Sequence, residues 1–177
     1  MIQLVGPGGA GKSTVGEALA THLACPFHDL DREFERQRSD IDVFIGTHGY
    51  EAYARENVAV YLELRPNLSG SVVALSSGLM VYPRSVHPAY DVVRTEIAEH
   101  FGTVVLLPSL DRETCVIETV RRQLARPFGN RGAVREEAVI RVRFQQYMEI
   151  PAAKVETMRS PGDVVAAILA QLAANAR

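Results

Sequence analysis

Residues 6–13 read Gly-Pro-Gly-Gly-Ala-Gly-Lys-Ser, which fits the pattern G-x-x-x-x-G-K-[ST] of a phosphate-binding loop. Glycines let successive backbone N–H groups turn toward phosphate oxygens, and the N-terminus of a following helix adds partial positive charge. The lysine of such a loop reaches the β- and γ-phosphates, and the hydroxyl after it ligates Mg²⁺. We therefore expect a nucleotide to be bound by Gly6, Gly8, Gly9, Ala10, Gly11, Lys12, Ser13 and Thr14.

The loop has the neighbours that this pattern requires. Residues 1–5 form a short apolar run suited to a buried strand, and residues 12–23 carry apolar side chains at helical spacing. The alternative is a glycine-rich turn that binds nothing. Of 19 basic residues only Lys12 and Lys154 are lysines, so this arginine-rich chain keeps a compact ammonium group where a phosphate loop needs one. Composition therefore favours the phosphate site.

Two carboxylates, Asp29 and Asp31, follow a second strand-like run at residues 25–29. One of them can hold a Mg²⁺-bound water, and the other can accept the proton of an attacking hydroxyl. Because Mg²⁺ uses few protein ligands, Ser13 and Asp29 suffice for a metal site. The alternative is that Asp31 caps the helix that follows, and the two roles are compatible.

An arginine-dense segment spans residues 121–143, with seven arginines against Glu136 and Glu137. Pro127, Gly129 and Gly132 interrupt its helical pattern. We interpret the segment as a flap whose arginines close over polyphosphate and exclude water. A solvated face or a nucleic-acid patch are the alternatives, and the latter is disfavoured by few nearby aromatics and a net charge of −2.

The order of elements predicts an α/β fold. Strand-like and helical runs alternate, which implies a parallel five-stranded sheet with helices on both faces, in one domain over residues 1–177. Ligands bind such sheets at the carboxyl ends of the strands. The expected strands are 1–5, 25–29, 71–75, 103–107 and 153–158. The expected helices are 12–23, 31–38, 50–64, 88–100, 111–124, 135–148 and 161–174.

Composition bounds the class of protein. The chain is 47% hydrophobic and nearly neutral, with no run of membrane-spanning length and an N-terminus unlike a signal peptide. Cys25 and Cys115 are too few for a disulfide framework and are expected to be small buried side chains. A cytoplasmic location is the expectation, with a small hydroxylated molecule as partner and no nucleic acid, membrane or obligate protein partner.

These motifs together resemble the shikimate kinase family, in the nucleoside-monophosphate-kinase-like branch of P-loop kinases. The opening loop and the D-x-D of Asp29 and Asp31 are similar to the family's, and so is Ala-Arg-Pro-Phe at 125–128. The resemblance implies ATP and Mg²⁺ as cofactors, an arginine-rich lid near 122–134 and an acceptor-binding region near 31–65. It implies phosphate contacts for Arg122 and Arg126, an adenine contact for Pro161 and a carboxylate contact for Arg143, which precedes Tyr147 in an R-x-x-x-Y pattern.

Two acceptor motifs depart from the family. Its G-E-x-x-F-R motif is matched by residues 49–54, where the carboxylate-binding arginine has become Ala54. Its G-G-G run is matched by Ser76, Ser77 and Gly78. Arg55 is the obvious replacement, but one residue along a helix is a rotation of about 100°. The expected acceptor-binding residues are Asp31, Tyr53, Arg55, Ser77, Gly78 and Arg143.

The sequence therefore predicts an ATP-dependent kinase that transfers the γ-phosphoryl group to a hydroxyl of a small polar metabolite, with shikimate a poor acceptor. Lys12, Asp31 and Arg126 are the expected catalytic residues. One alternative is a genuine shikimate kinase with a rearranged carboxylate site. Another is a non-catalytic nucleotide-binding module, which the retention of a candidate base at Asp31 disfavours.

Overall fold

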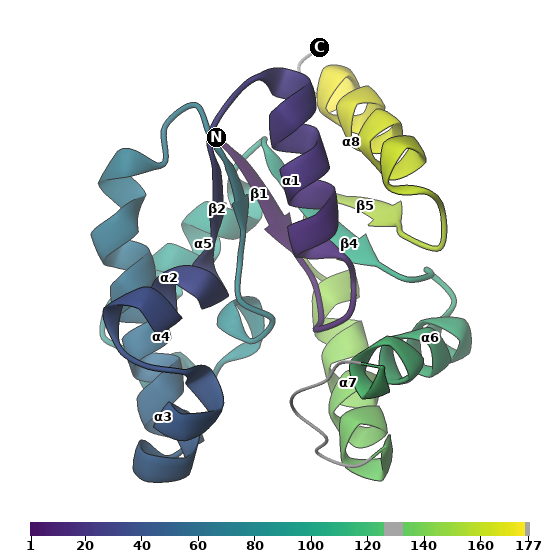
Figure 1. Ribbon diagram of the computed structural model, residues 1–177. Coiled ribbons are helices and arrows are strands. Elements are labelled where there is room, and N and C mark those ends of the chain that lie inside the picture. Colours follow the sequence, from purple (N-terminus) through teal and green to yellow (C-terminus); the bar gives the residue numbers. More distant parts are fainter. Residues whose placement is uncertain (126–132, 176–177) are drawn as a thin grey trace.

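The computed structural model describes residues 1–125 and 133–175, and these form a parallel α/β fold (Figure 1). Five strands pair side by side in the order β2-β3-β1-β4-β5, and every pairing is parallel. The predicted five-stranded parallel sheet is thus confirmed. The strands are β1 (Ile2–Val5), β2 (Phe27–Asp29), β3 (Val72–Ala74), β4 (Thr103–Leu107) and β5 (Ala153–Glu156).

The helices cover both faces of the sheet. They are α1 (Lys12–Leu23), α2 (Leu30–Gln37), α3 (Ile41–His48), α4 (Tyr50–Leu64), α5 (Tyr90–Glu99), α6 (Arg112–Leu124), α7 (Ala133–Met148) and α8 (Pro161–Asn175). Three 3₁₀ turns are η1 (Arg65–Asn67), η2 (Leu79–Val81) and η3 (Arg84–Val86). Helix α8 begins at Pro161 as expected, and the Ser160 hydroxyl accepts from the backbone N–H of Asp163 over 3.2 Å.

Helix α3 was not predicted from the sequence. It is only eight residues long, and its apolar residues Ile41, Phe44 and Ile45 are only partly buried against the core, so its apolar face is too short to stand out in the sequence. Its N-cap supports it instead, because the carboxylate of Asp40 accepts from the backbone N–H of Val43 over 3.0 Å. Cys25 also departs from expectation, since it is only half-buried, whereas Cys115 is buried as expected.

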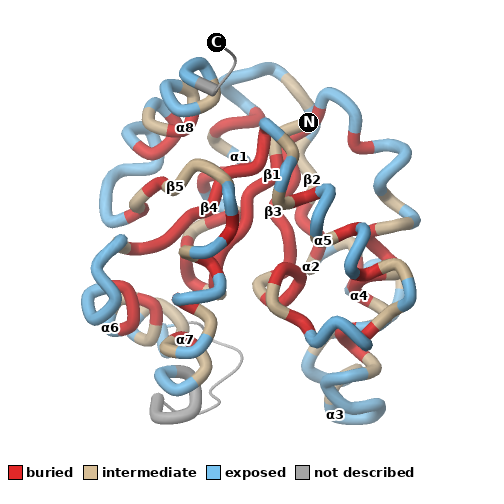
Figure 2. The backbone as a smooth tube through the Cα atoms, turned by 180° about the vertical axis from the view of Figure 1, so that it is seen from behind, coloured by how far each residue is buried: buried red, intermediate tan, exposed pale blue. Residues whose placement is uncertain are grey.

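Alternate residues of the central strands face two separate cores. Leu4, Val104 and Leu106 pack on one side, against apolar residues of α1 and α8. Val5 and Val105 pack on the other side, against residues of α2, α4, α5 and α7. Buried positions therefore concentrate along the sheet, with the outer surfaces of the helices exposed (Figure 2). No helix among the described residues is long and apolar enough to span a membrane.

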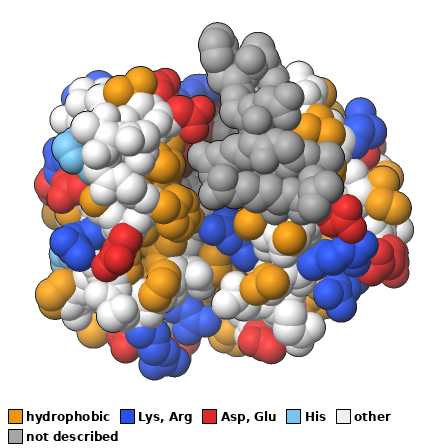
Figure 3. Space-filling model, turned by 90° about the horizontal axis from the view of Figure 1, so that it is seen from below, with side chains coloured by type: hydrophobic (Ala, Val, Ile, Leu, Met, Phe, Trp, Pro, Cys, Tyr) orange, Lys and Arg blue, Asp and Glu red, His pale blue; other side chains and the backbone are white. Residues whose placement is uncertain are grey.

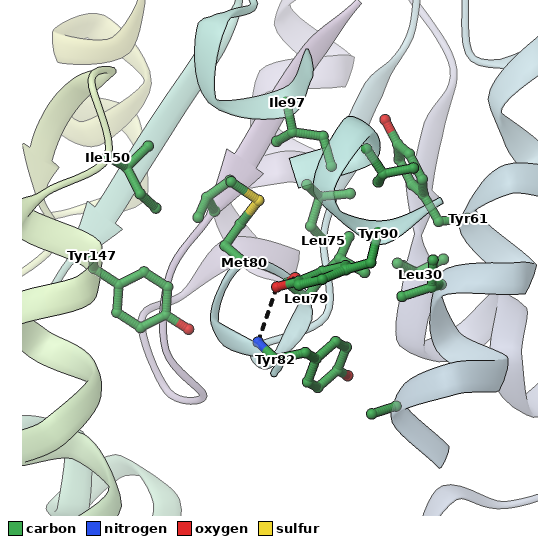
Figure 4. Close-up of a cluster of buried hydrophobic side chains, with 14 of the residues drawn as sticks. Leu30, Tyr61, Leu75, Leu79, Met80, Tyr82, Tyr90, Ile97, Tyr147 and Ile150 are labelled. Carbon is green, nitrogen blue, oxygen red and sulfur yellow. Dashed lines mark hydrogen bonds between the residues drawn. The ribbon is translucent and has the colours of Figure 1, made fainter. Parts of the chain in front are cut away.

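A buried tyrosine fixes the chain that follows β3. The hydroxyl of Tyr90, on α5, accepts from the backbone N–H of Tyr82 over 3.0 Å and donates to the carbonyl of Leu79 over 2.8 Å (Figure 4). From α7, the hydroxyl of Tyr147 donates to the carbonyl of Ser77. The loop that carries two predicted acceptor contacts is thus held from two helices.

The register of the sheet brings the functional loops together. Leu4 of β1 and Asp29 of β2 are both paired with Ala74 of β3, so the three strands end at the same level. The phosphate loop, the D-x-D segment and the segment after β3 therefore open from one edge of the sheet. This is the carboxyl edge, where parallel sheets bind their ligands.

Candidate nucleotide and acceptor site

The phosphate loop adopts a backbone that its glycines make possible. Gly6, Gly9 and Gly11 have φ values of 151°, 80° and 88°, a region that residues with a side chain rarely adopt. At Gly6, an added Cβ would lie 2.2 Å from the carbonyl oxygen of Leu106. At Gly8, it would lie 2.1 Å from Nε2 of Gln123. The loop therefore combines unusual torsions with close packing against its neighbours.

Lys12 is the first residue of α1, and its side chain turns back over the loop. Its ammonium group donates to the carbonyls of Gly6 and Pro7 over 2.7 and 2.9 Å. The side chain is largely buried yet lines the cavity beside the loop. A compact cation is thus held on the inner side of the phosphate loop, beside the N-terminus of a helix.

The two predicted metal ligands are in direct contact. The Ser13 hydroxyl donates to Oδ2 of Asp29 over 2.6 Å. The other carboxylate oxygen, Oδ1, accepts from the backbone N–H of Asp31 over 3.0 Å. Two oxygen ligands from neighbouring elements, one of them anionic, fit the preference of Mg²⁺ for few protein ligands of this type.

The helix cap falls on a different aspartate from the one suggested by sequence. Helix α2 begins at Leu30, and Asp29 is its N-cap, in an extended conformation. Asp31 lies in the first helical turn, so the alternative that it caps the helix is wrong. The reason is geometric. An N-cap carboxylate accepts from a backbone N–H two or three residues ahead, and Asp29, at the end of β2, accepts from the N–H of Asp31. The Asp31 side chain is left to line the cavity.

A cavity of about 800 Å³ extends from the phosphate loop toward α2, α3 and α7. Viewed from below, the surface is hollowed between two lobes, and hydrophobic side chains line much of the visible wall (Figure 3). The predicted residues that line this cavity are Gly8, Gly9, Gly11, Lys12, Ser13, Thr14, Asp29, Asp31, Tyr53, Ser77, Gly78 and Arg143. The candidate phosphate and acceptor residues thus face one space.

Asp31 and Tyr53 are in contact in the lining of this cavity. The phenol of Tyr53, from α4, donates to Oδ1 of Asp31 over 3.5 Å. Burial raises the pKa of Tyr53 far above its usual value, and the negative charge of Asp31 raises it further. Tyr53 therefore stays a neutral hydroxyl donor at neutral pH, beside a carboxylate that can accept a proton.

Arg143 reaches the cavity from α7. Its guanidinium donates to the hydroxyl of Tyr50 over 2.9 Å, which joins α7 to the start of α4 across the mouth of the cavity. Tyr50 was absent from the predicted set, although it follows the glycine of the altered acceptor motif. Gln123 of α6 also lines the cavity, and it carried no sequence signal because only the packing of α6 brings it there.

Arg55 does not replace the arginine lost at Ala54. Its Nε donates to the carbonyl of Val86 over 3.3 Å, and its guanidinium lies 3.6 Å from Glu51. Its side chain is exposed and is not part of the cavity lining, so the structure does not bring it to the predicted acceptor site. The rotation of about 100° per residue explains the outcome, because Ala54 takes the buried face of α4.

A second cavity of about 330 Å³ adjoins the other side of the loop. Arg122 donates to the carbonyls of Gly9 and Thr157 over 3.2 and 3.1 Å, and to Glu118 over 2.6 Å. Arg122 and Pro161, both predicted on the nucleotide side, line this cavity together. Its lining consists of Gly9, Gly11, Thr14, Val15, Arg122, Thr157, Arg159, Pro161 and Val164.

Besides Arg55, two described residues of the predicted set lie outside these linings. Gly6 contributes a carbonyl acceptor to Lys12, and Ala10 is fully buried. Arg126 lies outside the described residues, together with most of the predicted lid. Of the range 122–134, residues 122–124 end α6 and residues 133–134 begin α7.

The acceptor end of the cavity is acidic. Glu35, Asp40 and Asp42 line it in addition to Asp31, and none of these three was predicted. Partial burial raises the pKa of Glu35 above its usual value, and the charges of Asp40 and Asp31 raise it further. Their signal in the sequence was weak, because Asp40 and Asp42 reach the cavity only through the unpredicted helix α3.

A phosphate loop, two hydrogen-bonded oxygen side chains that fit a Mg²⁺ site and a carboxylate that lines the same cavity, all at the carboxyl edge of a parallel sheet, are the features of a P-loop small-molecule kinase. The family model described as shikimate kinase matches residues 8–173. The chain therefore belongs to the shikimate kinase family, whose members are phosphotransferases that act on a hydroxyl group.

Individual relatives agree with this assignment. A shikimate kinase of Thiobacillus denitrificans is 34% identical over 163 residues, covering 89% of this chain and 81% of the relative. One of Shewanella oneidensis is 33% identical over 172 residues, covering 93% and 91%. The solved shikimate kinase of Acinetobacter baumannii, in complex with shikimate, superposes with a TM-score of 0.73 at 26% identity, covering 98% and 93%.

The fold is also shared more widely. A gluconokinase structure from Sinorhizobium meliloti superposes with a TM-score of 0.60 at 21% identity, covering 98% of this chain and 91% of that one. The same architecture therefore occurs in a kinase named for a different acceptor, so the acceptor has to be argued from the site.

Proposed function

We propose that this chain transfers the γ-phosphoryl group of Mg·ATP to a hydroxyl of a small polar metabolite, and that shikimate is a poor acceptor. The observation that carries the proposal is that one cavity joins the phosphate loop, the Ser13–Asp29 pair and the carboxylate of Asp31. Binding a nucleotide alone would not need a carboxylate directed at the acceptor space.

The roles follow from the chemistry of each group. The loop N–H groups and Lys12 would bind the phosphates, and Ser13 and Asp29 would hold Mg²⁺. When bound, Mg²⁺ offsets negative charge on the β- and γ-phosphates. Asp31 accepts the proton of the acceptor hydroxyl as the phosphoryl group transfers, and Tyr53 donates to the same carboxylate and orients it. Arg122, Pro161 and the lid residue Arg126 belong to the nucleotide side.

The expected weak use of shikimate is argued from one arginine of the family motif that this chain lacks. In the family motif the arginine binds the acceptor carboxylate, and here the position is Ala54, buried on α4. A charge-assisted hydrogen bond contributes roughly 1.5–3 kcal/mol. Its loss should lower kcat/KM for shikimate by about one to two orders of magnitude, because each 1.4 kcal/mol is about tenfold.

The test is ATP consumption over a panel of sugar acids, polyols and cyclitols, with shikimate included and Ala54→Arg beside the native chain. We expect turnover of at least one member, weak turnover of shikimate, and a gain for shikimate in Ala54→Arg. A native kcat/KM for shikimate near about 10⁵ M⁻¹s⁻¹ would instead identify a shikimate kinase with a rearranged carboxylate site. ATP binding without turnover of any member would favour a non-catalytic nucleotide-binding module.

A further inference from the structure

A buried and uncharged hydrogen-bond network supports the acceptor end of the cavity. Asn57 is fully buried on α4, one turn after Ala54 and on the same face. Its amide nitrogen donates to the hydroxyl of Ser76 over 2.8 Å. Its amide oxygen accepts from the hydroxyl of Tyr82 over 3.2 Å. The side chains behind this wall of the cavity are therefore satisfied without any formal charge.

The network holds two tyrosines that face the cavity. The rings of Tyr50 and Tyr53 lie 5.8 Å apart, and the ring of Tyr82 lies 6.1 Å from that of Tyr50. Tyr82 also packs on Gly78, where an added Cβ would lie 2.4 Å from its ring. Burial raises the pKa of both Tyr53 and Tyr82 well above the usual value, so these phenols remain neutral.

The charges around the acceptor space disfavour an anion. Among the described lining residues, Asp31, Glu35, Asp40 and Asp42 face this end, and Arg143 is the cation there. Arg143 already donates to Tyr50. A carboxylate that entered this end of the cavity would lose hydration and would lie close to these four acidic side chains. Hydroxyl groups, in contrast, can both donate to carboxylates and accept from phenols.

We propose that the acceptor is an uncharged polyhydroxylated molecule, of the polyol or cyclitol class, whose hydroxyl groups are bound by Tyr50, Tyr53 and the surrounding carboxylates. Asn57 and Tyr82 are positioning residues, because they act through the two tyrosines that line the cavity. This inference rests on the proposed function and names the substrate class of the same site. A site whose polar groups bind the hydroxyl groups of a substrate discriminates against analogues in which one of these hydroxyl groups is replaced by another group.

The test uses pairs of acceptors that differ only in a carboxylate or a hydroxymethyl group. Suitable pairs are shikimate with its reduced alcohol, quinate with its reduced alcohol, and gluconate with glucitol. We expect kcat/KM to favour the neutral members by about tenfold or more. Equal or better use of the carboxylates would overturn the inference.

If no acceptor of any pair is phosphorylated, acceptor binding tests the inference instead. Calorimetry with a non-hydrolysable ATP analogue present should show tighter binding of the neutral members. If every neutral member fails to bind, the inference is overturned. The proposed function is judged separately. Binding of the ATP analogue without turnover of any acceptor would count against catalysis. The difference in binding affinity within each pair would still decide the acceptor class.

Variants of the positioning residues separate specificity from folding. Tyr82→Phe keeps the ring and removes the hydroxyl that Asn57 accepts from. We expect KM for the neutral members to rise about three- to tenfold with kcat nearly unchanged, since the lost contact orients the tyrosines. Tyr61→Phe is the matched control, on the helix that carries Asn57, because its hydroxyl donates to Gln3 in the core. If both variants change the neutral-to-anionic ratio equally, Tyr82 has no role in specificity.

Discussion

Ser13 and Asp29 are joined by a hydrogen bond of 2.6 Å that links the start of α1 to the end of β2. The same carboxylate caps α2 through its second oxygen. One side chain therefore connects the phosphate loop to the helix that carries Asp31. This arrangement sets the position of the candidate base relative to the phosphate loop.

Substitutions at Asp29 should separate its two roles. Asp29→Asn keeps a capping oxygen but removes the charge, so we expect little change in the free energy of unfolding. The Mg²⁺ concentration for half-maximal rate should rise about tenfold or more. Asp29→Ala should lose the cap as well, at about 1 kcal/mol. Urea unfolding and Mg²⁺ titrations measure the two effects, and equal stability loss in both variants would contradict the cap.

Lys12→Ala should weaken ATP binding and abolish turnover while leaving the fold intact. The lysine donates to the loop carbonyls of Gly6 and Pro7, and its side chain lines the cavity beside the loop. Lys154→Ala is the matched control, since Lys154 donates to the carbonyls of Ile150 and Ala152 near β5. Calorimetry with ATP and thermal unfolding test both variants. Unchanged ATP affinity in Lys12→Ala would contradict the phosphate site.

Gly78→Ala should destabilise the protein by roughly 1–3 kcal/mol, because the added Cβ would lie 2.4 Å from the ring of Tyr82. Gly46→Ala is the control, since nothing lies within 4 Å of an added Cβ there. At Gly46 alanine should be neutral or stabilising by up to about 1 kcal/mol, because it favours a helix. Chemical denaturation of both variants gives the comparison.

A double-mutant cycle identifies the contact at Gly78. If Tyr82 is the obstacle, Gly78→Ala should cost less in a Tyr82→Ala background than in the native chain. An equal cost in the two backgrounds would show that the ring of Tyr82 does not limit the residue at position 78.

Glu118 should make stability depend on acid pH. Hydrogen bonds from Arg121 and Arg122 lower the pKa of Glu118 from 4.5 to about 2. A carboxylate whose pKa is lower in the folded state stabilises the fold above its unfolded value and loses that contribution as pH falls toward the folded value. We expect Glu118→Gln to cost about 1 kcal/mol at pH 7, because solvent screens these surface pairs, with the difference from the native chain shrinking between pH 4.5 and 2.

The measurement is the free energy of unfolding by urea across this pH range. Glu99→Gln, at an exposed position on α5, serves as the control and should show a small effect throughout. Because Arg122 also contacts Gly9 of the phosphate loop, Glu118→Gln should weaken ATP binding too. A constant difference between Glu118→Gln and the native chain from pH 7 to 2 would contradict the assignment.

The sequence by itself determined the fold class and the phosphate loop. Both depend on local chemistry, since glycines at 6, 9 and 11 supply torsions that other residues rarely adopt, and apolar runs of strand length alternate with helical periodicity. The resemblance to shikimate kinases also followed from short motifs. The departure from the family motif at Ala54 is visible in the sequence, but the sequence does not show whether Arg55 takes the place of the missing arginine.

Only the tertiary structure decided how the acceptor end is built. Arg55 turns to Val86, Asn57 bonds Ser76 and Tyr82, and α3 brings Asp40 and Asp42 to the cavity. These contacts join residues far apart in the chain, on elements whose relative positions depend on packing across the sheet. A sequence pattern records periodicity along one element, and it carries no direct signal for which side chains from different elements will face one another.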